Sequence, residues 1–245
     1  MDENFRSTDL NKIQYTTVVA ENKLLRNSFA WMALAMLLTA ISALLFANMP
    51  ELTSLLLQQT EFGFKPTIFA YVVMFAPLLF VLGINFGLSR LSFPALIGLF
   101  VAYSIVNGIS FSFIFFVYNI GSITTVFLST TALFALMAVA GYTTKTDLTK
   151  MGSLLIIGVI GIVIASLINM FMGSAQLDYI ISILGVIIFT GLTAYDVQKI
   201  KNLGEQAGND SAVSSKLGII GALTLYLDFI NLFLFLLRLF GGKKD

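Results

Sequence analysis

Asp228 is the residue of this chain best placed to do chemistry, because it is a carboxylate inside a long apolar segment. Residues 217–237 contain no other charged side chain, and the preceding base, Lys216, lies about 18 Å away along a helix. A carboxylate near the middle of a bilayer costs at least about 2.5–3.5 kcal/mol, so it faces the protein interior and has a partner. We therefore expect a proton- or cation-responsive site at Asp228. The alternative is an acid buried for packing alone.

Asp196 is the expected partner of Asp228. It closes the apolar segment 179–195, and segments joined by one loop can pack side by side. Contact requires the helix to continue beyond Asp196, which the apolar Val197 and Ile200 allow. Two touching carboxylates cannot both be ionised without a large cost, so the pair would hold one proton and become a cation site when it is lost. Such oxygen ligands favour Ca²⁺ over transition metals. Taken alone, Asp196 is equally well explained as a solvated residue at a helix end.

Three further polar residues belong to this hypothesis. Arg90 lies in a short turn between two apolar segments and could neutralise Asp196 or Asp228 in one state, although an ordinary topogenic arginine is the favoured explanation. Asn231 lies one helical turn after Asp228, and Tyr195 directly precedes Asp196. We expect both to support the acid pair.

The composition limits the classes of protein to which the chain can belong. Of its 245 residues, 58% are hydrophobic and 11% are charged, whereas soluble domains are about 45–50% apolar and about 25% charged. Its 14 basic and 13 acidic residues give a net charge of +1, which argues against a nucleic-acid partner. The absence of cysteine and histidine removes thiolate chemistry and the usual general base. The sequence therefore predicts an integral membrane protein that works with carboxylates, hydroxyls, amides and a few cations.

The elements that must position these residues are membrane-spanning helices, each of about 20 mostly apolar residues. The polar and glycine-containing stretch from Tyr118 to Ser122 divides one long charge-free region into two spans. The predicted spans are 27–50, 66–89, two within 91–144, 151–177, 179–195 and 217–240. We therefore predict an all-α polytopic fold with seven transmembrane helices.

The charge distribution predicts the domain organisation and the orientation. Residues 1–26 form a polar N-terminal segment, 27–240 the transmembrane domain and 241–245 a short basic tail. With the N-terminus in the cytoplasm, most basic residues of the loops lie inside and only Lys65 lies outside, as the positive-inside rule requires. The basic tail would then lie outside, against the rule.

Three motifs resemble those of the Bax inhibitor-1 family, in its bacterial branch. They are Gly-Tyr-Thr-Thr-Lys-Thr-Asp-Leu at 141–148, Gly-Leu-Thr-Ala-Tyr-Asp-Val-Gln-Lys-Ile-Lys at 191–201 and Gly-Ala-Leu-Thr-Leu-Tyr-Leu-Asp-Phe-Ile-Asn-Leu-Phe at 221–233. The resemblance implies two three-helix layers around a central seventh helix, in a bacterial inner membrane. It also implies a pH-sensitive Ca²⁺ leak linked to stress responses. The family's aspartate sensor corresponds to Asp196 and Asp228, and its arginine to Arg90.

Other functions remain as alternatives to a leak channel. The paired acids are similar to those of intramembrane aspartyl proteases, but the sequence before Asp228 lacks their glycine motif, and Pro94-Ala95-Leu96 precedes both acids instead of following them. We therefore predict no enzyme and no catalytic residue. A non-conducting regulator that binds a membrane protease or a stress complex is the main alternative, and a proton-coupled transporter is another. The predicted partners are the lipid bilayer and Ca²⁺, with no cofactor beyond Ca²⁺ and H⁺ as transported or sensed ions.

Overall fold

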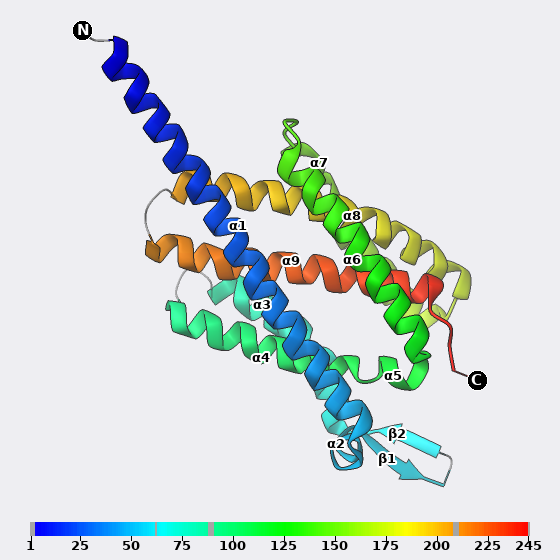
Figure 1. The fold of residues 1–245 in the computed structure, drawn as a ribbon. Coiled ribbons are helices and arrows are strands. Elements are labelled where there is room, and N and C mark those ends of the chain that lie inside the picture. The colour runs from blue at the N-terminus through cyan, green and yellow to red at the C-terminus, as the bar shows by residue number, and fades with distance from the viewer. Residues whose placement is uncertain (1–2, 62, 88–90, 208–210, 245) are drawn as a thin grey trace. The chain divides into compact units, whose positions relative to one another are not determined.

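The protein is described by a computed structural model that covers residues 3–61, 63–87, 91–207 and 211–244. These residues are mostly helical, with one antiparallel hairpin (Figure 1). The elements in chain order are α1 (Glu3–Asn48), α2 (Pro50–Leu56), β1 (Leu57–Thr60), β2 (Gly63–Pro66), α3 (Ile68–Gly87), α4 (Phe93–Phe111), α5 (Ile114–Val117), α6 (Ile120–Thr143), α7 (Thr149–Met172), α8 (Ala175–Ala207) and α9 (Ser211–Phe240).

Six helices in the described part of the chain are long and apolar enough to cross a membrane. Helices are the expected form of these segments, because every backbone polar group in lipid needs a partner within the segment. The candidate spans are Lys23–Asn48, Phe93–Val117, Ile120–Thr143, Thr149–Met172, Ala175–Gln206 and Val213–Phe240. The predicted break within 91–144 is present, since Tyr118 is extended between α5 and α6.

One boundary differs from the sequence-based prediction. Helix α1 runs from Glu3 to Asn48, so one helix includes most of the polar N-terminal segment and the first predicted span. The predicted end of the sixth segment at Asp196 is wrong, because α8 continues to Ala207. Apolar residues after Asp196 sustain this extension, since Val197 and Ile200 are almost fully buried. Asp196 is therefore an interior residue of its helix and not a residue at its end.

The described chain divides into two compact units, and α1 contributes to both. The first unit comprises Met1–Trp31 and Thr124–Gly241, and the second comprises Met32–Ile123 and Gly242–Asp245. Both predicted acids of the site, Asp196 and Asp228, belong to the first unit.

Helix α9 has the largest buried share of the six candidate spans. Helix α8 packs along it (Figure 1), and the ring of Phe189 on α8 stacks on Phe235 of α9 with 5.8 Å between centroids. On α6, Phe127 and Phe134 each lie 5.4 Å from the ring of Phe229. Aromatic contacts therefore hold α9 against two neighbouring helices close to Asp228.

In the second unit, α1 packs closely against α4. The Thr39 hydroxyl donates to the backbone oxygen of Ser104 at 2.9 Å, and Ser42 lies against Gly108. The hairpin between α2 and α3, which the sequence analysis did not predict, pairs Leu57 with Pro66 at its base.

The C-terminal tail is hydrogen-bonded to the connection between α5 and α6 within the second unit. The Asn119 N–H donates to the oxygen of Gly242 at 3.0 Å, and the Lys244 N–H donates to that of Val117 at 2.9 Å. Four candidate spans, α6 to α9, separate Tyr118 from this tail. After these four helices the chain therefore returns to the connection from which α6 begins.

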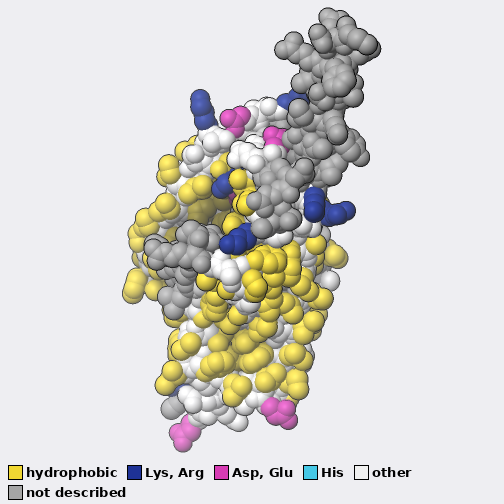
Figure 2. Space-filling model, turned by 90° about the vertical axis from the view of Figure 1, so that its left-hand side faces the viewer, with side chains coloured by type: hydrophobic (Ala, Val, Ile, Leu, Met, Phe, Trp, Pro, Cys, Tyr) yellow, Lys and Arg dark blue, Asp and Glu magenta, His cyan; other side chains and the backbone are white. Residues whose placement is uncertain are grey.

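Large apolar side chains are exposed along the candidate spans. Figure 2 shows hydrophobic side chains over much of the face that it draws. Helix α7 is the extreme case, because only 6% of its apolar window is buried, and Leu154 and Ile157 are 68% and 64% exposed. A surface of this kind is stable where lipid covers it, as expected for an integral membrane protein.

Candidate functional site

The structure brings the carboxyl groups of Asp196 on α8 and Asp228 on α9 together. They lie within hydrogen-bonding reach of each other, and the side chains are only 7% and 4% exposed. No hydrogen-bond donor among the described residues reaches Oδ2 of Asp228. Two carboxylates that touch away from water repel each other when both are ionised, so a proton or a cation between them is needed to stabilise the arrangement.

Tight packing of α8 on α9 keeps the two acids at this position. An added Cβ at Gly221 would lie 2.6 Å from the Ser28 hydroxyl and 3.1 Å from Ile200, so only glycine allows α1 and α8 to approach α9 this closely. Tyr226 and Leu225, which precede Asp228, are fully buried. The surrounding core therefore holds α8 and α9 close together at the level of the two acids.

Lys199 is the charged neighbour of this pair that the sequence analysis did not single out. It interacts electrostatically with Asp196, and its ammonium lies 5.7 Å from the centre of the Tyr195 ring. The signal was present in the sequence, because residues three apart share a helix face. The lysine partly offsets the charge of Asp196 without a direct ion pair.

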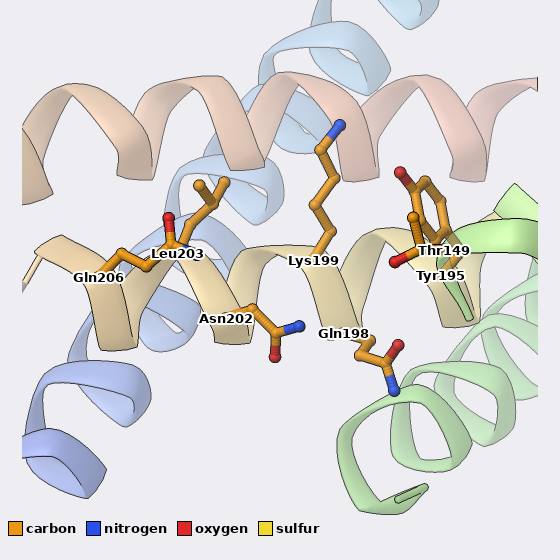
Figure 3. Close-up of a pocket in the computed structure, with 7 residues that line it drawn as sticks. All are labelled: Thr149, Tyr195, Gln198, Lys199, Asn202, Leu203 and Gln206. Carbon is orange, nitrogen blue, oxygen red and sulfur yellow. The ribbon is translucent and has the colours of Figure 1, made fainter. Parts of the chain in front are cut away.

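A polar pocket of about 180 Å³ lies along α8, the helix that carries Asp196 (Figure 3). Thr149 of α7 and a set of residues from α8 line it. The α8 residues are Tyr195, Gln198, Lys199, Asn202, Leu203 and Gln206. This pocket opens to the surroundings, so it places hydroxyl, amide and ammonium groups next to the helix that carries Asp196.

Gln198 connects α8 to the loop that precedes α7. Its Oε1 accepts from the Leu148 N–H at 2.9 Å, and its Nε2 donates to the Thr146 oxygen at 2.9 Å. In the same loop, Asp147 accepts from the Thr149 N–H at 2.9 Å, and these hydrogen bonds with Thr149 lower the pKa of Asp147 from its usual value. The loop is therefore held in one conformation, with an ionised aspartate at neutral pH.

Replacing Gln198 with Leu should lower the free energy of unfolding by about 1–3 kcal/mol, because the backbone groups of Leu148 and Thr146 lose their buried partner. Titration with a denaturing detergent, followed by circular dichroism, measures this change. Gln206→Leu is the matched control, because Gln206 lies on the same helix but is exposed. An equal loss in both variants would mean that the two hydrogen bonds do not stabilise the fold.

The other predicted site residues have different positions. Arg90 lies outside the described residues. The Asn231 amide donates to the Leu227 oxygen of its own helix at 2.8 Å. Tyr195 packs against Gly152 on α7 and lines the pocket. Among the described residues, neither Asn231 nor Tyr195 is hydrogen-bonded to the acid pair.

Two carboxylates alone provide too few oxygen ligands for a closed Ca²⁺ site. The described residues contain no group of three or more acidic side chains that could hold a metal ion. Ca²⁺ takes about 6–8 oxygen ligands, whereas two carboxylates offer four oxygens at most. Water or backbone oxygens would have to complete the shell, so binding at Asp196 and Asp228 would be weak.

Comparison with known proteins gives one consistent family. Residues 21–245 match the family described as "Inhibitor of apoptosis-promoting Bax1". The chain is 42% identical to the inner membrane protein YbhL of Escherichia coli K12 over 217 residues, which cover 88% of this chain and 90% of YbhL. A Borreliella burgdorferi protein is 40% identical over 228 residues, which cover 93% of this chain and 95% of that protein. This chain therefore belongs to the Bax inhibitor-1 family and is an integral membrane protein.

Proposed function

We propose that the protein is a passive, pH-sensitive cation leak, with Ca²⁺ as the main ion, gated by Asp196 and Asp228. The observation that carries the proposal is the contact between two buried carboxylates on neighbouring membrane-spanning helices. Acids within a membrane domain are costly and usually mark an ion or proton path. The family resemblance supports the same activity. No chemical step and no cofactor is proposed.

The gate follows from the charge of the pair. With one proton between them, Asp196 and Asp228 hydrogen-bond and hold α8 against α9. Without that proton, two negative charges repel each other and attract a cation. The packing of the two helices then has two states whose populations depend on pH. Arg90 is proposed as the cation that pairs with an acid in one of these states.

We propose that α3 is a seventh membrane span, in addition to the six helices identified by their length and hydropathy. Its described apolar part covers Ile68–Pro77, and its helix continues to Gly87. Seven crossings with the N-terminus in the cytoplasm place the tail outside, on the side of the α5–α6 connection to which it is hydrogen-bonded. The deep burial of α9 supports its position at the centre of two three-helix layers.

The relative YbhL is named an inner membrane protein, which supports the same location for this chain. Ca²⁺ entry into liposomes that contain the purified protein and a trapped Ca²⁺ indicator tests the proposal. We expect entry above that of empty liposomes, with a rate that changes with pH because the coupled carboxyl groups gain or lose their shared proton. Entry equal to that of empty liposomes at every pH would reject the leak. It would favour a non-conducting regulator that binds a membrane protease or a stress complex.

A further inference from the structure

The polar pocket beside Asp196 has the lining expected of an anion site. Its side chains are Thr149, Tyr195, Gln198, Lys199, Asn202, Leu203 and Gln206, so it contains one ammonium, hydroxyl and amide donors, and no acid. Asp147 and Glu205 lie nearby in sequence but do not line it. A ligand in this pocket would meet the ammonium group of Lys199 and the amide donors of Asn202 and Gln206. Phosphate oxygens satisfy such a set of groups well.

The pocket lies at the depth of the lipid headgroups. Helix α7 has 24 residues, which span about 36 Å at 1.5 Å per residue, slightly more than the hydrocarbon core of a bilayer. Thr149, its first residue, must therefore lie close to the membrane boundary. Helix α8 passes Thr149 at Tyr195 and continues to Ala207, so its last turns extend beyond that boundary.

An apolar surface for a lipid chain begins next to the pocket. Ile156 and Ile160 of α7 are 47% and 56% exposed, and they follow Thr149 by about two and three helical turns on the same face. A lipid with its headgroup in the pocket can therefore place an acyl chain along α7. The pocket and the apolar surface are independent features, and they fit the two ends of one molecule.

We propose that this pocket binds the phosphate group of an anionic glycerophospholipid, with Lys199 as its main charged contact. The amides of Asn202 and Gln206 supply hydrogen-bond donors around it. A zwitterionic phosphatidylethanolamine would bring its own ammonium group, which has no acidic partner in the lining. An anionic headgroup such as phosphatidylglycerol avoids this conflict, and basic pockets between helices commonly bind such lipids.

Native mass spectrometry of the purified full-length protein in detergent measures this binding directly. Phosphatidylglycerol and phosphatidylethanolamine are titrated separately, and the bound fraction is compared among variants. We expect a preference for phosphatidylglycerol, and Lys199→Met should weaken its binding about fivefold. Lys199→Arg should retain it. Lys65→Met removes the same charge from the hairpin, far from the pocket in sequence, and should leave binding unchanged.

Two further measurements separate the alternatives. Asn202→Leu changes an exposed lining residue without changing the charge, and it should also weaken phosphatidylglycerol binding. Equal binding by wild type and Lys199→Met would overturn the proposal, and displacement of the lipid by inorganic phosphate would assign the pocket to a soluble phosphate instead. If the protein binds phosphatidylglycerol through Lys199 but conducts no Ca²⁺ in any lipid, the leak is rejected while the lipid site stands.

Discussion

Liposomes that contain the Asp228→Asn protein should take up Ca²⁺ at a rate that no longer depends on pH. Asparagine keeps the shape of the side chain but cannot lose a proton, so the pair with Asp196 no longer alternates between a proton-bridged and a doubly charged state. In wild type, the two populations can change by up to about tenfold per pH unit. We expect that response to fall below about twofold in both Asp228→Asn and Asp196→Asn.

Asp178→Asn is the matched control for these variants. Asp178 lies in the first turn of the same helix, is about half exposed and lies 3.7 Å from Arg238. It is not part of the acid pair, and its replacement should leave the pH profile of Ca²⁺ entry unchanged. Gating by the pair would be contradicted if Ca²⁺ entry still depended on pH in Asp228→Asn. It would also be contradicted if Asp178→Asn lost this pH dependence to the same extent.

Gly141→Ala should lower the free energy of unfolding by about 1–3 kcal/mol, the usual cost of overpacking. A Cβ at Gly141 on α6 would collide with the backbone carbonyl of Ala194 on α8. Backbone atoms cannot rotate away as the end of a side chain can, so α6 must move away from α8. Ala194 lies two residues before Asp196, and the same movement should therefore also disturb the acid pair.

Denaturing-detergent titration of Gly141→Ala against Gly161→Ala measures this effect. Gly161 lies on α7, and a Cβ there has no neighbour within 4 Å. The substitution at Gly161 should be neutral or stabilise by about 0.5–1 kcal/mol, because alanine loses less conformational freedom in a helix than glycine does. Unchanged stability in Gly141→Ala would show that α6 and α8 can separate at little cost.

The positions of most helices could be predicted from the sequence, because a membrane-spanning helix depends on local composition. Uninterrupted apolar segments predicted spans that correspond to α1, α4, α6, α7, α8 and α9. The end of α8 could not be placed in this way. The charge of Asp196 marks the end of the apolar segment in the sequence. The helix nevertheless continues to Ala207, because Val197 and Ile200 are buried against neighbouring helices.

The surroundings of the site depended on contacts between distant segments. Gln198 reaches Thr146 and Leu148 in the loop before α7, some 50 residues earlier in the chain. No local pattern predicts such a pairing. The pocket that includes Lys199 also needs Thr149 from α7, and the hairpin after α2 carries no apolar periodicity long enough to have been recognised.

The sequence by itself determined that this chain lies in a membrane, that it is helical, and that Asp196 and Asp228 are its unusual acids. These properties follow from composition and from the cost of placing a charge in an apolar segment, which are local quantities. Only the tertiary structure decided that the two carboxylates touch and that Thr149 of α7 completes a polar pocket with residues of α8. Those contacts depend on how α8 and α9 pack, and close packing is set by the shapes of side chains far apart in the sequence.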